Sequence, residues 1–349
     1  MQHLRNTQAT QTRVLAHLNE TPFPSNEADR AARLIQRCPR AAETPLRSMP
    51  ELARMAGVAE LHIKDERARM GLGSFKALGA AYVIATDDEQ GTAAGQTYVT
   101  ASAGNHGLSV AAGAAAFGAQ AVVYIAETVP AGFAARLERL GARVVREGAT
   151  YEDSMAAAAD AAEQQGWILL SDSSWPGYYD RPWTLMEGYL VLAQEVVAQM
   201  QRPPTHVFLQ AGVGGLAVAC ATHFRAAWGP DLRIVVVEPE VAAALYGSMQ
   251  AGAPRISPGP VSAMGRLDCK EPSLIALKGL ARDADDFVLV SEAAGAAASD
   301  ASAAAGLPTT PSGAAGLAGL LTAADDPARL GLTAESRVLV ILSEDAEGA

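Results

Sequence analysis

A lysine lies at the start of an expected helix, in the segment GLGSFKALGA at residues 71–80. Lys76 follows Ser74 and Phe75 and leads into an alanine-rich stretch. The positive end of the helix dipole and the apolar neighbours both disfavour an ammonium group, so they predict a lowered pKa for this lysine. A neutral amine is what Schiff-base chemistry requires. Lys76 is therefore a candidate for covalent chemistry with a carbonyl group, and the alternative is a surface lysine with a partly covered stem.

A second segment, TASAGNHG at residues 100–107, follows an expected strand and precedes an expected helix. Its small residues place backbone N–H groups at a helix N-terminus, which is a favourable place for an anion. Asn105 and His106 add side-chain donors. The alternative is a capped turn between strand and helix, with Asn105 as the cap.

A third segment, LQAGVGGLAVA at residues 209–219, also joins an expected strand to an expected helix. Gly212, Gly214 and Gly215 allow a phosphate to approach the main-chain N–H groups closely. The pattern is not GxGxxG and no Lys-Ser/Thr pair follows, so neither a dinucleotide fingerprint nor a P-loop fits. The segment predicts a site for a single phosphate monoester, or else a tight turn between strand and helix.

Two polar residues end further expected strands. Ser343 lies at the end of the strand in VLVILSED, where its hydroxyl could face a bound ring. Asp172 follows the apolar strand at residues 168–170 and stands near Trp175, where a carboxylate could be partly desolvated and transfer protons. Each residue can also be an ordinary polar strand end or turn cap.

Alternating strands and helices must position these residues. Several strand candidates, such as VVYI, IVVV and VLVIL, are apolar on both faces, which is typical of a parallel sheet covered by helices on both sides. The strands are expected at residues 61–64, 97–100, 121–125, 143–145, 168–170, 206–210, 234–238, 287–290 and 338–342. The helices are expected at residues 50–56, 75–87, 105–117, 132–140, 151–165, 183–200 and 216–227, with another in the alanine-rich tract 293–305. This order predicts an α/β fold with doubly wound sheets and with sites at the carboxyl ends of strands.

Composition limits the kinds of partner. The chain has 349 residues and a formal net charge of −11, so its field repels nucleic acid and anionic membrane surfaces. The uncharged stretch at residues 107–126 is rich in alanine and glycine and predicts a buried helix followed by a strand, not a membrane span. The first twenty residues have no apolar core typical of a secretory signal. We therefore expect a cytoplasmic protein that binds neither membrane nor nucleic acid.

Cysteine usage agrees with a reducing compartment. The chain has three widely spaced cysteines and no CxxC pair, which argues against a disulfide scaffold and against a structural zinc site. These residues are Cys38, Cys220 and Cys269.

Together, the lysine, the two turns and the terminal serine resemble the fold-type-II pyridoxal-phosphate enzymes, the tryptophan synthase β-like group that includes threonine dehydratase, serine racemase and cysteine synthase. Within that group the chain is most similar to the diaminopropionate ammonia-lyases. The more particular matches are KDERARMGLGSFKALGAAY, SDSSWPGYYD at 171–180, MEGY at 186–189, THVFLQAGVGG at 205–215, VEPE at 237–240 and CKEPS at 269–273. The resemblance spans about residues 44–343 and implies two domains. The large cofactor-binding domain would comprise residues 1–90 plus 190–349, and the small mobile domain residues 91–189.

The resemblance also implies roles for individual residues. Lys76 would form the Schiff base with pyridoxal 5'-phosphate and then shuttle protons, and Phe75 would lie beside the cofactor. Asn105 would bond the phenolic oxygen, and Ser343 would pair with the pyridine nitrogen. Asp172 would be an acid–base group. The phosphate would be bound by Gly212, Val213, Gly214, Gly215 and Leu216. The substrate carboxylate would be held by Ser102, Ala103, Gly104, Asn105 and His106.

Several positions depart from the ammonia-lyase pattern. Ala103 replaces an aspartate found in ammonia-lyases that accept both stereoisomers, so one face of the site lacks a base and the resemblance does not decide whether the D-substrate reacts. Ala244 stands where a partner cysteine for Cys269 can occur, so no disulfide is expected. The run Thr310-Pro311-Ser312 replaces a glutamate often found before the late SGAAG turn. We expect no metal site, because the chain lacks a clear set of carboxylates like the one that binds a divalent metal in the racemases; Glu238 and Glu240 are the nearest candidates.

The expected activity is an α,β-elimination from a β-substituted amino acid such as 2,3-diaminopropionate, giving a 2-oxo acid and ammonia. A dehydratase acting on serine, threonine or another 3-hydroxy amino acid is the alternative, which Ala103 favours and the match at 205–215 opposes. A non-catalytic cofactor-binding paralogue and a β-replacement synthase remain further alternatives. Homodimers are usual in the group, so a homodimer is expected.

Overall fold

The computed structural model of the chain describes residues 1–346, and its strands form two separate sheets. The larger sheet has seven strands in the order β1-β10-β9-β8-β11-β3-β2. Its five inner strands run parallel, and β1 and β2 pair antiparallel at the two edges. The strands are β1 (Gln2–Arg5), β2 (Leu46–Ser48), β3 (Glu60–Asp65), β8 (His206–Gln210), β9 (Arg233–Pro239), β10 (Asp286–Val290) and β11 (Arg337–Leu342).

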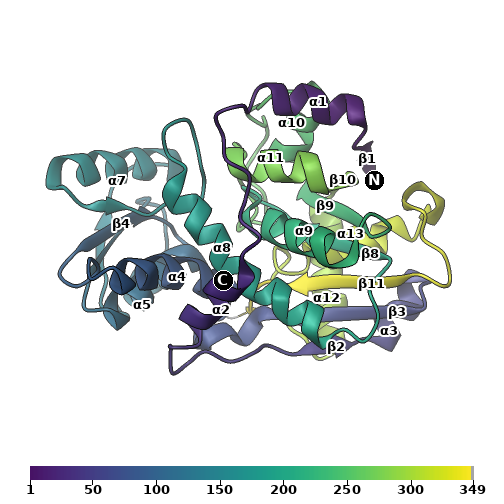
Figure 1. The fold of residues 1–349 in the computed structure, drawn as a ribbon, viewed down its shortest axis with the longest axis horizontal. Helices are drawn as coiled ribbons and strands as arrows, with labels where there is room; N and C mark the ends of the chain where they lie inside the picture. Colours follow the sequence, from purple (N-terminus) through teal and green to yellow (C-terminus); the bar gives the residue numbers. More distant parts are fainter. Residues whose placement is uncertain (347–349) are drawn as a thin grey trace.

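The smaller sheet has four parallel strands in the order β6-β5-β4-β7. They are β4 (Thr97–Ala101), β5 (Gln120–Ile125), β6 (Arg143–Arg146) and β7 (Ile168–Leu169). Figure 1 shows this sheet with α4, α5 and α7 in one half of the molecule and the seven-stranded sheet in the other. The α/β class with parallel sheets is thus confirmed.

The helices connect the strands and cover the sheets (Figure 1). The α-helices are α1 (Gln8–Ala16), α2 (Ala28–Ile35), α3 (Pro50–Ala56), α4 (Lys76–Glu89), α5 (Asn105–Ala116), α6 (Ala131–Arg139), α7 (Tyr151–Gln165), α8 (Asp180–Gln199), α9 (Gly215–Trp228), α10 (Ala244–Ala251), α11 (Leu274–Asp283), α12 (Glu292–Ala304) and α13 (Ala315–Ala323). Two short 3₁₀ helices, η1 (Glu66–Gly71) and η2 (Pro327–Leu330), complete the set.

Alternate residues of the inner strands enter two different hydrophobic clusters, as burial on both faces requires. In β11, Leu339 and Ile341 belong to the cluster under α8, α9 and α11, whereas Val338, Val340 and Leu342 belong to the cluster under α3, α12 and α13. The pattern VLVIL therefore predicts the sandwiching of this strand correctly.

Close contact between α4 and α8 depends on two glycines. A Cβ at Gly188 would lie 2.6 Å from the carbonyl oxygen of Leu78, and one at Gly79 would lie 2.7 Å from Cε1 of Tyr189. Neither distance is tolerated by real side chains, so the two helices meet backbone to backbone. This contact fixes the start of α4, where Lys76 lies.

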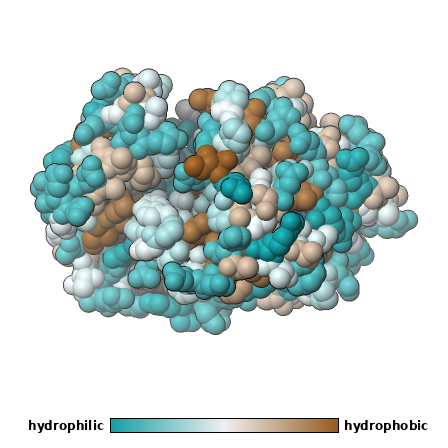
Figure 2. All heavy atoms as spheres, turned by 90° about the horizontal axis from the view of Figure 1, so that it is seen from above, coloured by the Kyte–Doolittle hydropathy of each residue, from teal (hydrophilic) through white to brown (hydrophobic). Residues whose placement is uncertain are grey.

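The surface is mostly polar. Figure 2 shows a largely hydrophilic face on which hydrophobic residues form small separate groups, and its outline is notched between two lobes. No helix within residues 1–346 is long and apolar enough to cross a membrane. The uncharged stretch at 107–126 forms most of α5 and all of β5, as predicted.

Candidate active site

Lys76 is the first residue of α4, and its amine forms an ion pair with the carboxylate of Asp172. The start of α4 is tied to β11, because the Phe75 N–H donates to the Ser343 carbonyl oxygen at 3.1 Å. The hydroxyl of Ser109, on α5, donates to the Lys76 carbonyl oxygen at 2.7 Å. The lysine is thus held where α4, α5 and the end of β11 meet.

The pKa of Lys76 differs from the sequence prediction. Burial disfavours the ammonium, but the Asp172 carboxylate outweighs burial and holds the pKa of Lys76 above its ordinary value. Burial also opposes ionisation of Asp172, yet the charge of Lys76 holds the pKa of Asp172 well below its ordinary value. The expectation of a lowered lysine pKa was wrong because the sequence does not show that this carboxylate, 96 residues away, lies against the amine.

The turn at residues 102–106 lies at the end of β4, where α5 begins. The Gly104 N–H donates to the Ser102 hydroxyl at 3.2 Å, and no side chain in the described part of the chain caps the helix. Within residues 1–346, the backbone N–H groups of Asn105, His106 and Gly107 have no acceptor. The turn can therefore bind a carboxylate through its main chain.

The side chain of His106 does not serve as a donor to this turn. Its Nε2 lies 2.8 Å from the Leu170 carbonyl oxygen, and burial lowers the pKa of the imidazole. A neutral imidazole that donates from Nε2 has no further N–H. His106 thus positions the end of β7 and offers the turn only its backbone N–H, whereas the sequence predicted a side-chain donor.

The turn at residues 212–216 joins β8 to α9 and is shaped by glycine. Gly214 has φ +101°, and a Cβ there would lie 2.8 Å from that of Ala276. A Cβ at Gly212 would lie 2.9 Å from Sγ of Cys269. The backbone N–H groups of Gly212, Gly214, Gly215 and Leu216 find no acceptor in the described part of the chain. These N–H groups fit the oxygens of a phosphate monoester.

Ser343 and Phe75 lie next to each other at the end of β11. Ser343 is buried, and its hydroxyl has no hydrogen-bond partner among residues 1–346. A hydroxyl of this kind fits a ring nitrogen. The ring of Phe75 packs edge-on against that of Tyr189, with ring centroids 4.9 Å apart.

Glu344 and Arg266 also lie at the site and escape sequence reasoning, and Cys269, for which the sequence predicted no role at the site, lies there too. Glu344 accepts a hydrogen bond from Asn105 Nδ2 at 2.5 Å, and Arg266 Nη1 donates to the Ala103 carbonyl oxygen at 3.2 Å. Burial raises the pKa of the Cys269 thiol to about 12, so this thiol is not reactive near neutral pH. The position of Glu344 directly after Ser343 is the one signal that could have found it.

The cysteines and acidic residues among residues 1–346 form no other reactive cluster. All three cysteines are free thiols. No group of three or more histidine, cysteine, aspartate or glutamate residues in the described region could hold a metal ion. Burial raises the pKa of Glu238 to about 8, and its carboxylate accepts the backbone N–H groups of Leu245 and Tyr246. Glu238 therefore caps the start of α10.

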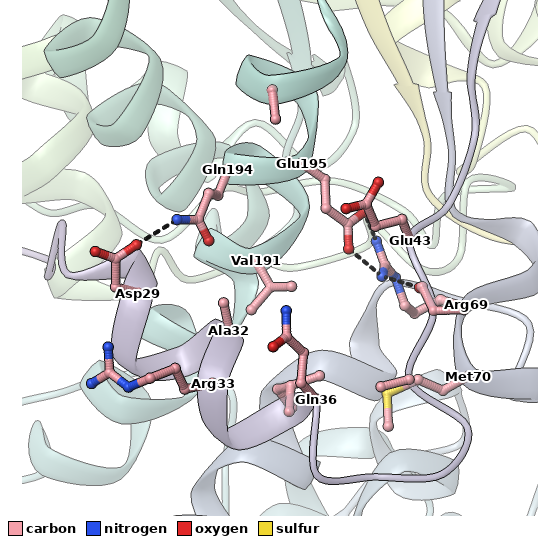
Figure 3. A pocket seen from close by; sticks show the side chains of 14 residues that line it. Asp29, Ala32, Arg33, Gln36, Glu43, Arg69, Met70, Val191, Gln194 and Glu195 are labelled. Carbon is pink, nitrogen blue, oxygen red and sulfur yellow. Dashed lines mark hydrogen bonds and ion pairs between the residues drawn. The ribbon is translucent and has the colours of Figure 1, made fainter.

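A separate hollow of about 600 Å³ lies between α2 and α8 and contains none of these residues. Figure 3 shows Arg69 pointing at Glu195 there, with a hydrogen bond of 2.6 Å between Gln194 and Asp29. Arg69 also binds Glu66, and Lys64 binds Glu195 at 2.6 Å, so the charges under the hollow already neutralise one another. This network links β3, η1 and α8 and is structural.

Comparisons with known proteins agree with this site. Residues 39–344 match the family described as "Pyridoxal-phosphate dependent enzyme". The diaminopropionate ammonia-lyase of Salmonella typhimurium is 33% identical over 268 residues, which cover 69% of this chain and 66% of that protein. The biosynthetic L-threonine dehydratase of Burkholderia multivorans is 31% identical over 185 residues, 51% of this chain and 34% of that protein.

A solved structure shows the same arrangement over nearly the whole chain. It is that of Escherichia coli diaminopropionate ammonia-lyase in complex with an aminoacrylate-PLP azomethine intermediate, with a TM-score of 0.87 and 29% identity. The match covers 99% of this chain and 93% of that one. The chain therefore belongs to the pyridoxal-phosphate dependent enzymes, and its cofactor is pyridoxal 5'-phosphate.

Proposed function

We propose that this pyridoxal-phosphate enzyme is an ammonia-lyase that removes the β-substituent of an amino acid such as 2,3-diaminopropionate and yields a 2-oxo acid and ammonia. The observation that carries the proposal is the Lys76–Asp172 pair, an amine and a carboxylate in contact beside two turns with free N–H groups. The likeness to diaminopropionate ammonia-lyases of known sequence and structure supports the same reaction.

Different residues of the site would bind different parts of the cofactor. The N–H groups of the 212–216 turn would hold the cofactor phosphate, and Lys76 would hold its aldehyde carbon. Asn105 would donate to the phenolic oxygen, and the Ser343 hydroxyl would meet the pyridine nitrogen. When bound, the cofactor withdraws electrons from the α-carbon. A neutral hydroxyl leaves the ring uncharged, which suits an elimination driven by a good leaving group.

The turn at residues 102–106 would hold the substrate carboxylate. Its free N–H groups lie at the positive end of the α5 dipole, which stabilises an anion. Ser102 and Gly104 shape this turn, and Ala103 contributes no charge to it.

Lys76 and Asp172 would move the protons of the reaction. The α-proton must be removed, and the β-amino group must gain a proton to leave as ammonia. In the pair the proton lies on Lys76, because Asp172 holds the pKa of the lysine above its ordinary value and Lys76 holds the pKa of Asp172 below its own. Lys76 as a neutral amine, or the Asp172 carboxylate, would take the α-proton, and the Lys76 ammonium would return a proton to the leaving nitrogen.

A dehydratase acting on 3-hydroxy amino acids is the second candidate. Ala103 favours it, because the turn before α5 then lacks a carboxylate that could serve a second face of the substrate. The likeness to threonine dehydratase covers a smaller share of the chain than that to the ammonia-lyases. The same absence of a carboxylate predicts reaction with L-substrates only.

The test is an absorbance spectrum of the holoenzyme followed by addition of L- and D-diaminopropionate, L-serine and L-threonine in turn. The proposal expects the visible band to shift, and ammonia to appear, with L-diaminopropionate. Turnover of L-serine or L-threonine alone would establish the dehydratase instead. A band that shifts with no amino acid would contradict both candidates.

We further propose that the enzyme works in the cytoplasm, since its three free cysteines suit a reducing compartment. We also propose that it forms a homodimer, as the resemblance to this group of enzymes implies. The division into a large domain at residues 1–90 plus 190–349 and a small mobile domain at 91–189 also remains a proposal. It is supported by the four-stranded sheet, whose strands all lie between Thr97 and Leu169.

A further inference from the structure

Glu344 is a buried carboxylate where four separate segments of the chain meet. Only 2% of the residue is exposed. Its Oε1 accepts the hydroxyl of Thr310, and its Oε2 accepts Asn105 Nδ2 at 2.5 Å and lies 3.7 Å from Arg266 Nε. Glu344 itself follows β11, directly after Ser343. Both carboxylate oxygens are therefore engaged.

The partners of Glu344 offset part of the cost of burying it. Burial is the largest effect and leaves the pKa of the carboxyl group above its ordinary value, although Thr310, Arg266 and Asn105 act in the opposite direction. A buried carboxylate is costly unless it is paired and hydrogen-bonded. The three partners supply a hydroxyl, a guanidinium and an amide, which is the set a buried carboxylate requires.

Arg266 is itself fixed against the turn that precedes α5. Its Nη1 donates to the Ala103 carbonyl oxygen at 3.2 Å, and its backbone N–H donates to the Ser312 hydroxyl at 3.1 Å. A Cβ at Gly104 would lie 3.3 Å from Nη1, so the guanidinium packs directly on the turn. The positive charge beside Oε2 is thus held in place and does not swing with solvent.

The contact with Glu344 determines how the Asn105 amide is turned. The amide atom that faces the carboxyl group is Nδ2, which donates to Oε2, while Oε1 accepts the hydroxyl of Thr310. The amide oxygen of Asn105 is buried and has no partner among residues 1–346. One hydrogen of Nδ2 is used by Glu344, and the second remains to be donated.

We propose that Glu344 is a positioning residue that holds the Asn105 amide with its NH₂ group toward the phenolic oxygen of the cofactor. This inference rests on the role proposed above for Asn105, but not on which amino acid the enzyme converts. Without the carboxylate, the amide can turn by 180° and place its oxygen beside the phenolic oxygen, where two acceptors repel. Thr310 and Arg266 hold the carboxylate so that this alternative is disfavoured.

The test uses the resting enzyme without substrate. The dissociation constant of pyridoxal phosphate and the position of the visible band are measured for Glu344→Gln, Asn105→Ala and the double variant. The net contribution of one hydrogen bond corresponds to a weakening of roughly two- to tenfold, which we expect for each single variant together with a shifted band. The double variant should be no weaker than Asn105→Ala, because Glu344 acts through Asn105.

A matched control and a milder variant accompany these proteins. Glu335→Gln makes the same substitution at an exposed glutamate just before β11 and should change neither readout. Thr310→Val removes one hydroxyl that holds the carboxylate and should shift the band in the same direction by a smaller amount. If the Glu344→Gln protein does not fold, Thr310→Val still tests whether the carboxylate positions the Asn105 amide.

The outcomes separate this inference from the proposed function. If Asn105→Ala alters affinity and band while both Glu344→Gln and Thr310→Val do not, the positioning role is overturned. Additive losses in the double variant would also overturn it, because Glu344 would then act independently of Asn105. If the coupling is found but none of the tested amino acids releases ammonia, the inference stands and the proposed reaction fails.

Discussion

The most informative perturbation of the site is Asp172→Asn. The substitution keeps the shape of the side chain and removes the charge that faces Lys76. Asp172 is the main reason that the pKa of Lys76 lies above its ordinary value of 10.5 despite burial. With asparagine in its place, burial is the larger effect and the pKa of Lys76 falls below 10.5.

Two opposite rate changes follow from that fall. More of the lysine is neutral near pH 7, so the apoenzyme should form its visible band with pyridoxal phosphate faster than the parent protein does. Turnover should fall by about 10²- to 10⁴-fold, the range for loss of a general acid–base group. Because Lys76 can lose its proton in the Asp172→Asn variant, the decrease in the free energy of unfolding should be smaller than the roughly 3–5 kcal/mol typical of a buried charge left without its partner.

The assay combines stopped-flow absorbance during cofactor binding with ammonia release at saturating substrate, both measured at several pH values from about 6 to about 10. Asp231→Asn, on the exposed turn before β9, is the matched control and should behave as the parent. A fall in turnover of less than about tenfold would leave Asp172 a purely structural role. Slower cofactor binding at neutral pH would refute the reasoning about the lysine.

Four further predictions follow from the same geometry. Lys76→Ala should abolish turnover and the cofactor band that depends on the lysine, while circular dichroism shows an intact fold. Gly214→Ala should weaken cofactor binding and lower the free energy of unfolding by about 1–3 kcal/mol, because alanine rarely adopts φ +101° and its Cβ would lie 2.8 Å from that of Ala276. Cofactor titration and denaturant unfolding measure the two effects. Ala103→Asp should allow ammonia release from D-diaminopropionate, and an unchanged preference for the L-form would contradict the meaning given to Ala103. The apoenzyme should lose stability as the pH decreases below 3.8, the ordinary pKa of an aspartate, because folding lowers the pKa of Asp172. It should also lose stability as the pH increases above 10.5, the ordinary pKa of a lysine, because folding raises the pKa of Lys76. The free energy of unfolding measured as a function of pH checks both limits.

Inner strands were predictable because their burial leaves a local pattern. The runs HVFLQ, RIVVVEP and RVLVIL are apolar on both faces and form β8, β9 and β11. The edge strands β1 and β2 have the short polar sequences QHLR and LRS, which carry no such pattern. They become strands only because β10 and β3 offer an open edge to pair with.

The elements of the site were predictable for a related reason. Each turn joins a strand to a helix within a few residues, so the glycines at 212–215 and the small residues at 102–104 mark anion-binding N–H groups in the sequence alone. The order of strands and helices then implies that such turns lie at the carboxyl ends of parallel strands. The residue types, their spacing and the phosphate site that they predict were thus determined locally, whereas the cofactor was implied by the resemblance to known enzymes.

Only the tertiary structure decided the electrostatics of the site. Asp172 meets Lys76 across 96 residues, and Glu344 meets Asn105 across 239. A pKa depends on the charges and the burial around a group, and both arise from packing between distant segments. The direction of the Lys76 pKa shift, the neutral state of His106 and the orientation of the Asn105 amide therefore follow from the fold and from no local stretch of the chain.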